Sequence, residues 1–139
     1  MRDELLRRAI GLAQKARDLG EMPFGSLLAA SNGDVLIEEW NTVLSGNDIS
    51  AHPEFKLALW ASRNLDSATA KTTTMYTSCQ PCGMCTGAIE RSGLGKVVYA
   101  LATEQLNSLK PSGSTLTGFE LDGPALFDEA RVPIDGYYS

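Results

Sequence analysis

Two cysteines and the only histidine of the chain form the pattern with the clearest chemistry. Cys82 and Cys85 open a segment expected to be helical, and His52 lies 82 − 52 = 30 residues earlier, directly before another expected helix. Residues at positions i and i+3 share one helix face, so both thiols can reach the same ion. The dipole and free N–H groups of a helix start favour thiolate, the form that binds metals. The pattern therefore predicts a metal site where two helices begin.

The number of ligands indicates a catalytic zinc site. Catalytic zinc commonly has three protein ligands and leaves a fourth position for water, whereas structural zinc has four. Zinc lowers the pKa of such a water from 15.7 toward about 7. Glu54 lies two residues after His52 and can carry a proton between this water and a leaving group. His-x-Glu followed by Pro-Cys-x-x-Cys is typical of zinc-dependent nucleobase deaminases.

Other interpretations of the same residues remain open at this point. Glu54 could only complement the dipole of its helix, and Cys82-x-x-Cys85 could be a redox pair, although a redox pair would not explain His52. Cys79 extends the cysteines to C-x-x-C-x-x-C, but an iron–sulfur cluster of the ferredoxin type needs a fourth thiolate. A closed site of three cysteines and one histidine is also conceivable. We interpret Cys79 as a small buried residue and not as a ligand.

Length and charge exclude several classes of protein. The 139 residues predict a single domain over 1–139, and the net charge of -5 gives no basic footprint for nucleic acid. No apolar run approaches the roughly 20 residues of a membrane helix, and the charged first residues do not resemble a signal peptide. Three cysteines are too few for a disulfide scaffold. We expect a cytoplasmic protein without membrane or nucleic-acid partners.

Hydrophobic periodicity places the chemical residues on an α/β framework. The expected helices cover 2–19, 53–65 and 83–91, with a short one within 121–130; the expected strands cover 24–31, 35–40, 72–78 and 96–101. An Asn32-Gly33-Asp34 turn predicts a hairpin between the first two strands, and residues 41–51 look irregular. The last strand–helix–strand unit requires a parallel pair. The prediction is a three-layer α/β/α domain around a central mixed sheet.

The ordered motifs resemble the cytidine deaminase superfamily, on the branch of guanine, cytosine and tRNA adenosine deaminases. The matching pieces span about residues 2–105 and are Pro23-Phe24-Gly25, Asn41, His52-Pro53-Glu54, Tyr76-Thr77-Ser78-Cys79-Gln80-Pro81-Cys82-Gly83-Met84-Cys85 and Ala88-Ile89. The resemblance implies a cytidine-deaminase-like fold, a homodimer, and Zn²⁺ on His52, Cys82 and Cys85. It also implies Glu54 as the proton shuttle, with Phe24 lining the base pocket, Asn41 bonding the base and the Ser78 backbone facing the reacting amino group.

Two positions depart from the usual pattern of this superfamily. Pro53 stands where Ala or Gly is usual, and Gln80 stands where Glu is common. In the cytosine deaminases that the chain resembles, the backbone N–H of the residue between His and Glu donates to the pyrimidine 2-oxo group, and proline has no such N–H. The expected function is hydrolytic deamination of a free nucleobase or related amino-heterocycle, such as guanine, cytosine or an aminotriazine. The alternatives are a tRNA adenosine deaminase and a non-catalytic zinc-stabilised interaction module.

Overall fold

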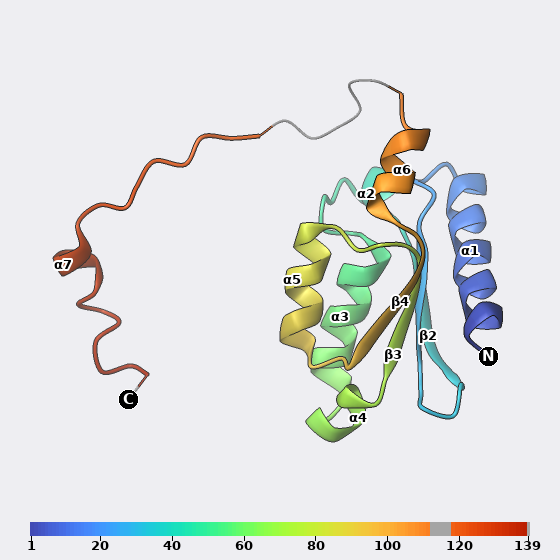
Figure 1. Cartoon of the computed structure of the whole chain (residues 1–139), viewed down its shortest axis with the longest axis horizontal. Helices are drawn as coiled ribbons and strands as arrows, with labels where there is room; N and C mark the ends of the chain where they lie inside the picture. Colours follow the sequence, from blue (N-terminus) through green and yellow to red (C-terminus); the bar gives the residue numbers. More distant parts are fainter. Residues whose placement is uncertain (112–117, 139) are drawn as a thin grey trace.

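The computed structural model describes residues 1–111 and 118–138 (Figure 1). Its helices are α1 (Arg2–Asp18), α2 (Val43–Gly46), α3 (Pro53–Asn64), α4 (Ser67–Lys71), α5 (Gly83–Ser92), α6 (Thr103–Leu109) and α7 (Phe127–Ala130). Its strands are β1 (Gly25–Ala29), β2 (Val35–Trp40), β3 (Thr74–Cys79) and β4 (Lys96–Leu101). Among the described helices, none has the length and apolar character needed to cross a membrane.

The four strands form one mixed sheet in the order β2-β1-β3-β4. β1 is antiparallel to both of its neighbours, and β3 is parallel to β4, as the strand–helix–strand pattern predicted. Every residue of β1 is buried, which explains why this strand has a continuous apolar sequence in place of an alternating one. The mixed sheet and the hairpin between β1 and β2 are therefore confirmed.

Helices cover both faces of the sheet, which confirms the three layers (Figure 1). Alternate residues of a strand point to opposite faces, so neighbouring residues of β1 serve different layers. Leu27 packs with Leu5 of α1 on one face, whereas Leu28 packs with Leu57 of α3 and Ile89 of α5 on the other. Two apolar layers thus hold α1 on one side and α3 with α5 on the other.

The structure differs from the sequence-based expectations mainly in short elements. The segment 41–51 contains the single-turn helix α2, and the unpredicted α4 and α6 each begin at a local capping contact. The Asp66 side chain accepts from the Thr69 N–H at 2.8 Å, and the Gln105 side chain accepts from the Ala102 N–H at 2.8 Å. The helix expected within 121–130 is reduced to α7. Helices this short are stabilised by such caps and lack the apolar stripe that reveals a longer helix.

The described residues of the C-terminal segment, 118–138, stand away from the layered body (Figure 1). Their side chains are exposed, including the large apolar ones of α7 and its surroundings. Tyr137 and Tyr138 pack edge to face against each other, with ring centroids 4.9 Å apart. The folded body that positions the chemical residues thus consists of α1 to α6 and the four strands.

Gly25 marks the closest approach of α1 to the sheet and gives a stability prediction. A Cβ at this position would lie 2.5 Å from the Ala13 nitrogen and 2.5 Å from the Leu12 Cβ. We expect Gly25→Ala to lower the free energy of unfolding by about 1–3 kcal/mol, because the helix must move away from β1. Gly11→Ala is the matched control: a Cβ there meets nothing within 4 Å, so it should stabilise α1 by about 0.5–1 kcal/mol. Urea unfolding measures both, and equal midpoints would contradict this account.

Candidate active site and metal centre

The candidate ligands come from the first residues of two neighbouring helices. His52 precedes α3, with Pro53 at the first helical position, where no backbone donor is needed. Cys82 occupies the same flanking position before α5, and Cys85 lies within its first turn. α3 and α5 pack on the same face of the sheet, and α5 begins just after the carboxyl end of β3. Ligand sites of α/β proteins are commonly found at this end of the strands.

The three side chains have the separations that a tetrahedral zinc ion requires. The His52 Nδ1 atom lies 3.6 Å from the Cys82 Sγ atom and 3.4 Å from the Cys85 Sγ atom, and all three candidate ligand atoms are within 4.8 Å of one another. Zn–S bonds of about 2.3 Å and Zn–N bonds of about 2.0–2.1 Å at a tetrahedral angle place N and S about 3.6 Å apart. The donor set and its spacing therefore fit zinc.

Cys79 does not belong to this cluster. Within the described residues, the group able to hold a metal ion consists of His52, Cys82 and Cys85. Cys79 ends β3 and is buried, as expected from its small apolar character. Burial also raises the pKa of its thiol. The geometry thus agrees with an open three-ligand site and gives no support to a closed site of three cysteines and one histidine.

Burial dominates the electrostatics of the site. It lowers the pKa of His52, which favours the neutral imidazole that binds metals. It raises the pKa of the Cys85 thiol, and the nearby Glu54 carboxylate raises it further, so zinc must displace this proton when it binds. Glu54 is only 6% exposed, and burial raises its pKa to about 7. A carboxyl group in this range can both accept and donate a proton near neutrality.

The three expected substrate contacts lie at one end of the sheet. Because β1 is antiparallel to both neighbours, its start meets the ends of β2 and β3. The Asn41 N–H donates to the Phe24 carbonyl at 3.0 Å, and the Gly25 N–H donates to the Ser78 hydroxyl at 3.1 Å. Phe24 is half-buried, Asn41 is 1% exposed and Ser78 is 7% exposed. The register therefore brings Phe24, Asn41 and Ser78 together at the end of the sheet where α5 begins.

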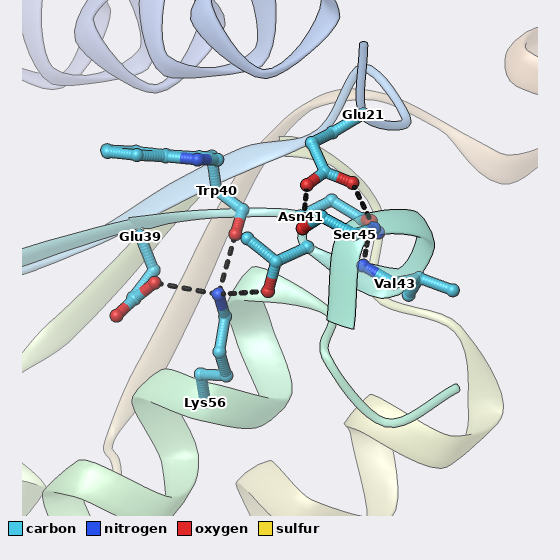
Figure 2. A network of polar contacts seen from close by, with 8 residues as sticks. Glu21, Glu39, Trp40, Asn41, Val43, Ser45 and Lys56 are labelled. Atoms are coloured by element: carbon cyan, nitrogen blue, oxygen red, sulfur yellow. Dashed lines mark hydrogen bonds and ion pairs between the residues drawn. The ribbon is translucent and has the colours of Figure 1, made fainter. Parts of the chain in front are cut away.

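A network of charged side chains around Asn41 was not predicted from the sequence. Lys56, in the first part of α3, contacts Glu39, the Trp40 carbonyl and Thr42, while Glu21 binds Ser45 (Figure 2). The charged residues Lys56, Glu39 and Glu21 come from three segments that are far apart in the sequence. Each of them alone has the residue type of an ordinary solvated surface. No local spacing could have revealed the network.

The aromatic ring of Trp40 has its own cation partner. The Lys15 ammonium of α1 lies 4.5 Å from the centre of this ring. Because the Trp40 carbonyl accepts from Lys56, the residue is held by one ammonium group from α1 and another from α3. The last residue of β2 is thus fixed from both helical layers just before Asn41.

Comparison with known proteins agrees with this site. Residues 1–101 match the family described as the cytidine and deoxycytidylate deaminase zinc-binding region. The chain is 33% identical to a probable cytosine deaminase of Schizosaccharomyces pombe, over 96% of this chain and 90% of that protein. It is 32% identical to a tRNA-specific adenosine deaminase of Haemophilus influenzae, over 70% of this chain and 56% of that protein. The crystal structure of guanine deaminase from Bacillus subtilis superposes with a TM-score of 0.75 at 25% identity, covering 99% of this chain and 94% of that one.

The fold and the three-ligand site define a zinc-dependent hydrolase of the deaminase class. The chain belongs to the cytidine and deoxycytidylate deaminase zinc-binding family. The resemblance inferred from the motifs, the α/β fold and the zinc cofactor on His52, Cys82 and Cys85 are therefore confirmed.

Proposed function

We propose that this deaminase acts on a free nucleobase or a related amino-heterocycle and releases ammonia. The observation that carries the choice of a small substrate is the charge of the chain, which has 12 Lys and Arg against 17 Asp and Glu. Binding of RNA depends mainly on neutralising phosphates with basic side chains. After Cys85, the basic residues are Arg91, Lys96, Lys110 and Arg131. Such a sparse set is poorly suited to a tRNA.

Asn41 supports a substrate with a hydrogen-bond acceptor on its edge. The Asn41 side-chain oxygen accepts from the Val43 N–H at 2.9 Å, which fixes the orientation of the amide. The amide nitrogen is left to donate. A ring nitrogen or carbonyl oxygen of a nucleobase is a suitable acceptor, and the half-buried ring of Phe24 would form an apolar wall beside it.

Glu54 is the proposed proton shuttle. Zinc at His52, Cys82 and Cys85 supplies Lewis-acid chemistry that activates water for attack on the ring carbon bearing the amino group. Glu54 accepts a proton of this water and delivers it to the neighbouring ring nitrogen. It then accepts the second proton, from the hydroxyl group now bonded to that carbon, and transfers it to the amino group, which leaves as ammonia when the C–N bond breaks and the carbonyl forms. The Ser78 backbone would face that amino group during the reaction.

A panel of substrates tests the proposed function. Ammonia release by the zinc-loaded protein is measured with cytosine, guanine, 2-amino-1,3,5-triazine, cytidine and adenosine. We expect turnover of at least one free base or triazine and much slower reaction of the nucleosides. Turnover restricted to nucleosides would contradict the proposal.

A tRNA adenosine deaminase is the second candidate, because several relatives carry that name. For a chain with a net charge of -5, we expect no micromolar binding of tRNA at moderate salt. Salt-sensitive micromolar binding, together with inosine in the anticodon, would favour this second function over the first.

A homodimer is part of the proposal. A groove between α3 and α5 is lined by Phe55, Leu59, Met84 and Ala88 and would suit a second copy of the chain. Sedimentation equilibrium tests this assembly independently of the substrate, and a monomer at micromolar concentration would contradict it.

Pro53 gives a prediction about specificity. This residue is buried between His52 and Glu54 and has no N–H to donate to a substrate carbonyl. A buried carbonyl without its donor costs about 1–3 kcal/mol, or about ten- to a hundredfold in kcat/KM. We therefore expect Pro53→Ala to raise kcat/KM for cytosine relative to guanine and the aminotriazine by about this factor. Zinc content and the thermal midpoint serve as controls, and an unchanged ratio would show that the missing donor does not set specificity.

A further inference from the structure

Lys56 makes three polar contacts with the Asn41 loop, the name used for residues 39–45, which run from the end of β2 into α2. Its ammonium group donates to the Trp40 carbonyl at 2.8 Å and to the Thr42 hydroxyl at 3.1 Å, and it pairs with the Glu39 carboxylate at 2.9 Å (Figure 2). An ammonium group has three N–H donors, so these partners satisfy all of them. The Lys56 side chain is 27% exposed, which places the ammonium between α3 and the end of β2, partly shielded from water.

The contacts of Lys56 lie on both sides of Asn41. Trp40 precedes Asn41 and Thr42 follows it. One ammonium group therefore binds the backbone carbonyl before Asn41 and the side-chain hydroxyl after it. A second anchor acts further along the loop, where Glu21 accepts from the Ser45 N–H at 3.0 Å and from its hydroxyl. Figure 2 shows Lys56 and Glu21 reaching the loop from opposite sides. Asn41 is therefore held within a segment fastened at several points.

The helix that carries Lys56 also carries the chemical residues. His52 precedes α3, Glu54 is its second residue, and the Lys56 N–H donates to the His52 carbonyl at 3.0 Å. A contact from this turn to residues 39–42 consequently fixes the distance between Asn41 and the proton shuttle. A displacement of about 1 Å between groups that hold a substrate can reduce kcat/KM by about 10²-fold.

We infer that Lys56 is a positioning residue that holds the Asn41 amide in place relative to Glu54 and the zinc ligands. This inference rests on the proposed contact between Asn41 and the base. A partly exposed ion pair with a purely structural role would contribute at most about 1 kcal/mol to stability and would not depend on Asn41. The two roles therefore predict different results when Lys56 and Asn41 are changed together.

A double-mutant cycle separates these roles. Lys56→Met keeps the aliphatic stem and removes the three donors, and we expect it to lower kcat/KM about 10- to 100-fold for the base in the panel that reacts fastest. The loss should be mainly a rise in KM, because Asn41 would bind the ground state and the transition state alike. In the Asn41→Ala background, Lys56→Met should have little further effect. Additive losses in the double variant would overturn the inference.

Two further variants keep the test decisive. Thr42→Val removes one of the three contacts with little change in shape, and it should raise KM in the same way but by a smaller factor. This variant takes the place of Lys56→Met if Lys56→Met folds poorly. Arg8→Met is the matched control, because Arg8 pairs with Glu38 of the same strand at 2.5 Å but comes from α1 and does not contact the loop. We expect Arg8→Met to retain the KM of the parent protein. An equal rise in KM for Arg8→Met would overturn the inference.

Hydrogen exchange of the Val43 amide gives a readout that does not need a substrate. This N–H donates to the Asn41 side chain, so its exchange rate reports the position of that side chain. We expect exchange at least tenfold faster in Lys56→Met and unchanged in Arg8→Met. Faster exchange in a protein that deaminates none of the free bases would support the positioning role while rejecting the proposed function. Unchanged exchange in Lys56→Met would overturn the positioning role whatever the substrate.

Discussion

Glu54→Gln is expected to reduce the rate of ammonia release by about 10²–10⁴-fold, because glutamine keeps the size of the side chain but cannot carry a proton. The substitution should leave the fold intact, since Glu54 is nearly buried and burial raises the pKa of its carboxyl group to about 7. A neutral amide is therefore a mild change for this environment. Turnover with the best base of the panel, zinc content and the thermal midpoint are measured together.

The matched control is Glu90→Gln on the exposed side of α5, which should retain full activity and full zinc content. Near-normal turnover of Glu54→Gln would show that another group moves the proton. If the parent protein releases no ammonia from any compound tested, the non-catalytic zinc-stabilised module becomes the better interpretation of the same ligands.

Cys82→Ser is expected to remove the zinc ion and to destabilise the fold. Cys82 is the exposed ligand, so its replacement leaves no cavity in the core and the effect reports the metal. Zinc joins segments that are 82 − 52 = 30 residues apart. By the loop-closure argument used for disulfides, such a cross-link contributes about 3–4 kcal/mol. We therefore expect a lower thermal midpoint, which chelation of zinc from the parent protein should reproduce.

Elemental analysis supplies the decisive comparison for the metal site. The parent protein and Cys79→Ser should each contain one zinc ion per chain, because Cys79 lies outside the ligand cluster. Loss of zinc from Cys79→Ser would indicate a closed four-ligand site and would argue against hydrolytic chemistry at this centre.

The zinc ligands could be predicted because their pattern is local. Cys82 and Cys85 share one turn of a helix, and the pairing of His52 with Glu54 is equally short in sequence. The hairpin and the mixed character of the sheet were also predictable, since the apolar run of β1, the turn after it and the later strand–helix–strand pattern are local signals. A motif and a periodicity need only neighbouring residues.

The contacts around Asn41 required the folded structure. Lys56 contacts Glu39, and Glu21 contacts Ser45, only because α3 and the segment after α1 both approach the chain around Asn41. Such long-range polar contacts have no spacing in the sequence, and the residue types are those of any solvated surface. The short helices α4 and α6 were not predicted for a related reason, because each depends on a single side-chain cap.

The cation above the Trp40 ring has a spectroscopic consequence. The chain has two tryptophans, and Trp60→Phe would leave Trp40 as the only indole that fluoresces. Its ring lies 4.5 Å from the Lys15 ammonium, and its carbonyl is bound by Lys56, one residue before Asn41. Any displacement of this loop moves the indole relative to a fixed positive charge and changes its emission. The protein thus carries an optical reporter one residue before the proposed base-binding residue, and a base that displaces this segment on binding would change the emission without an added label.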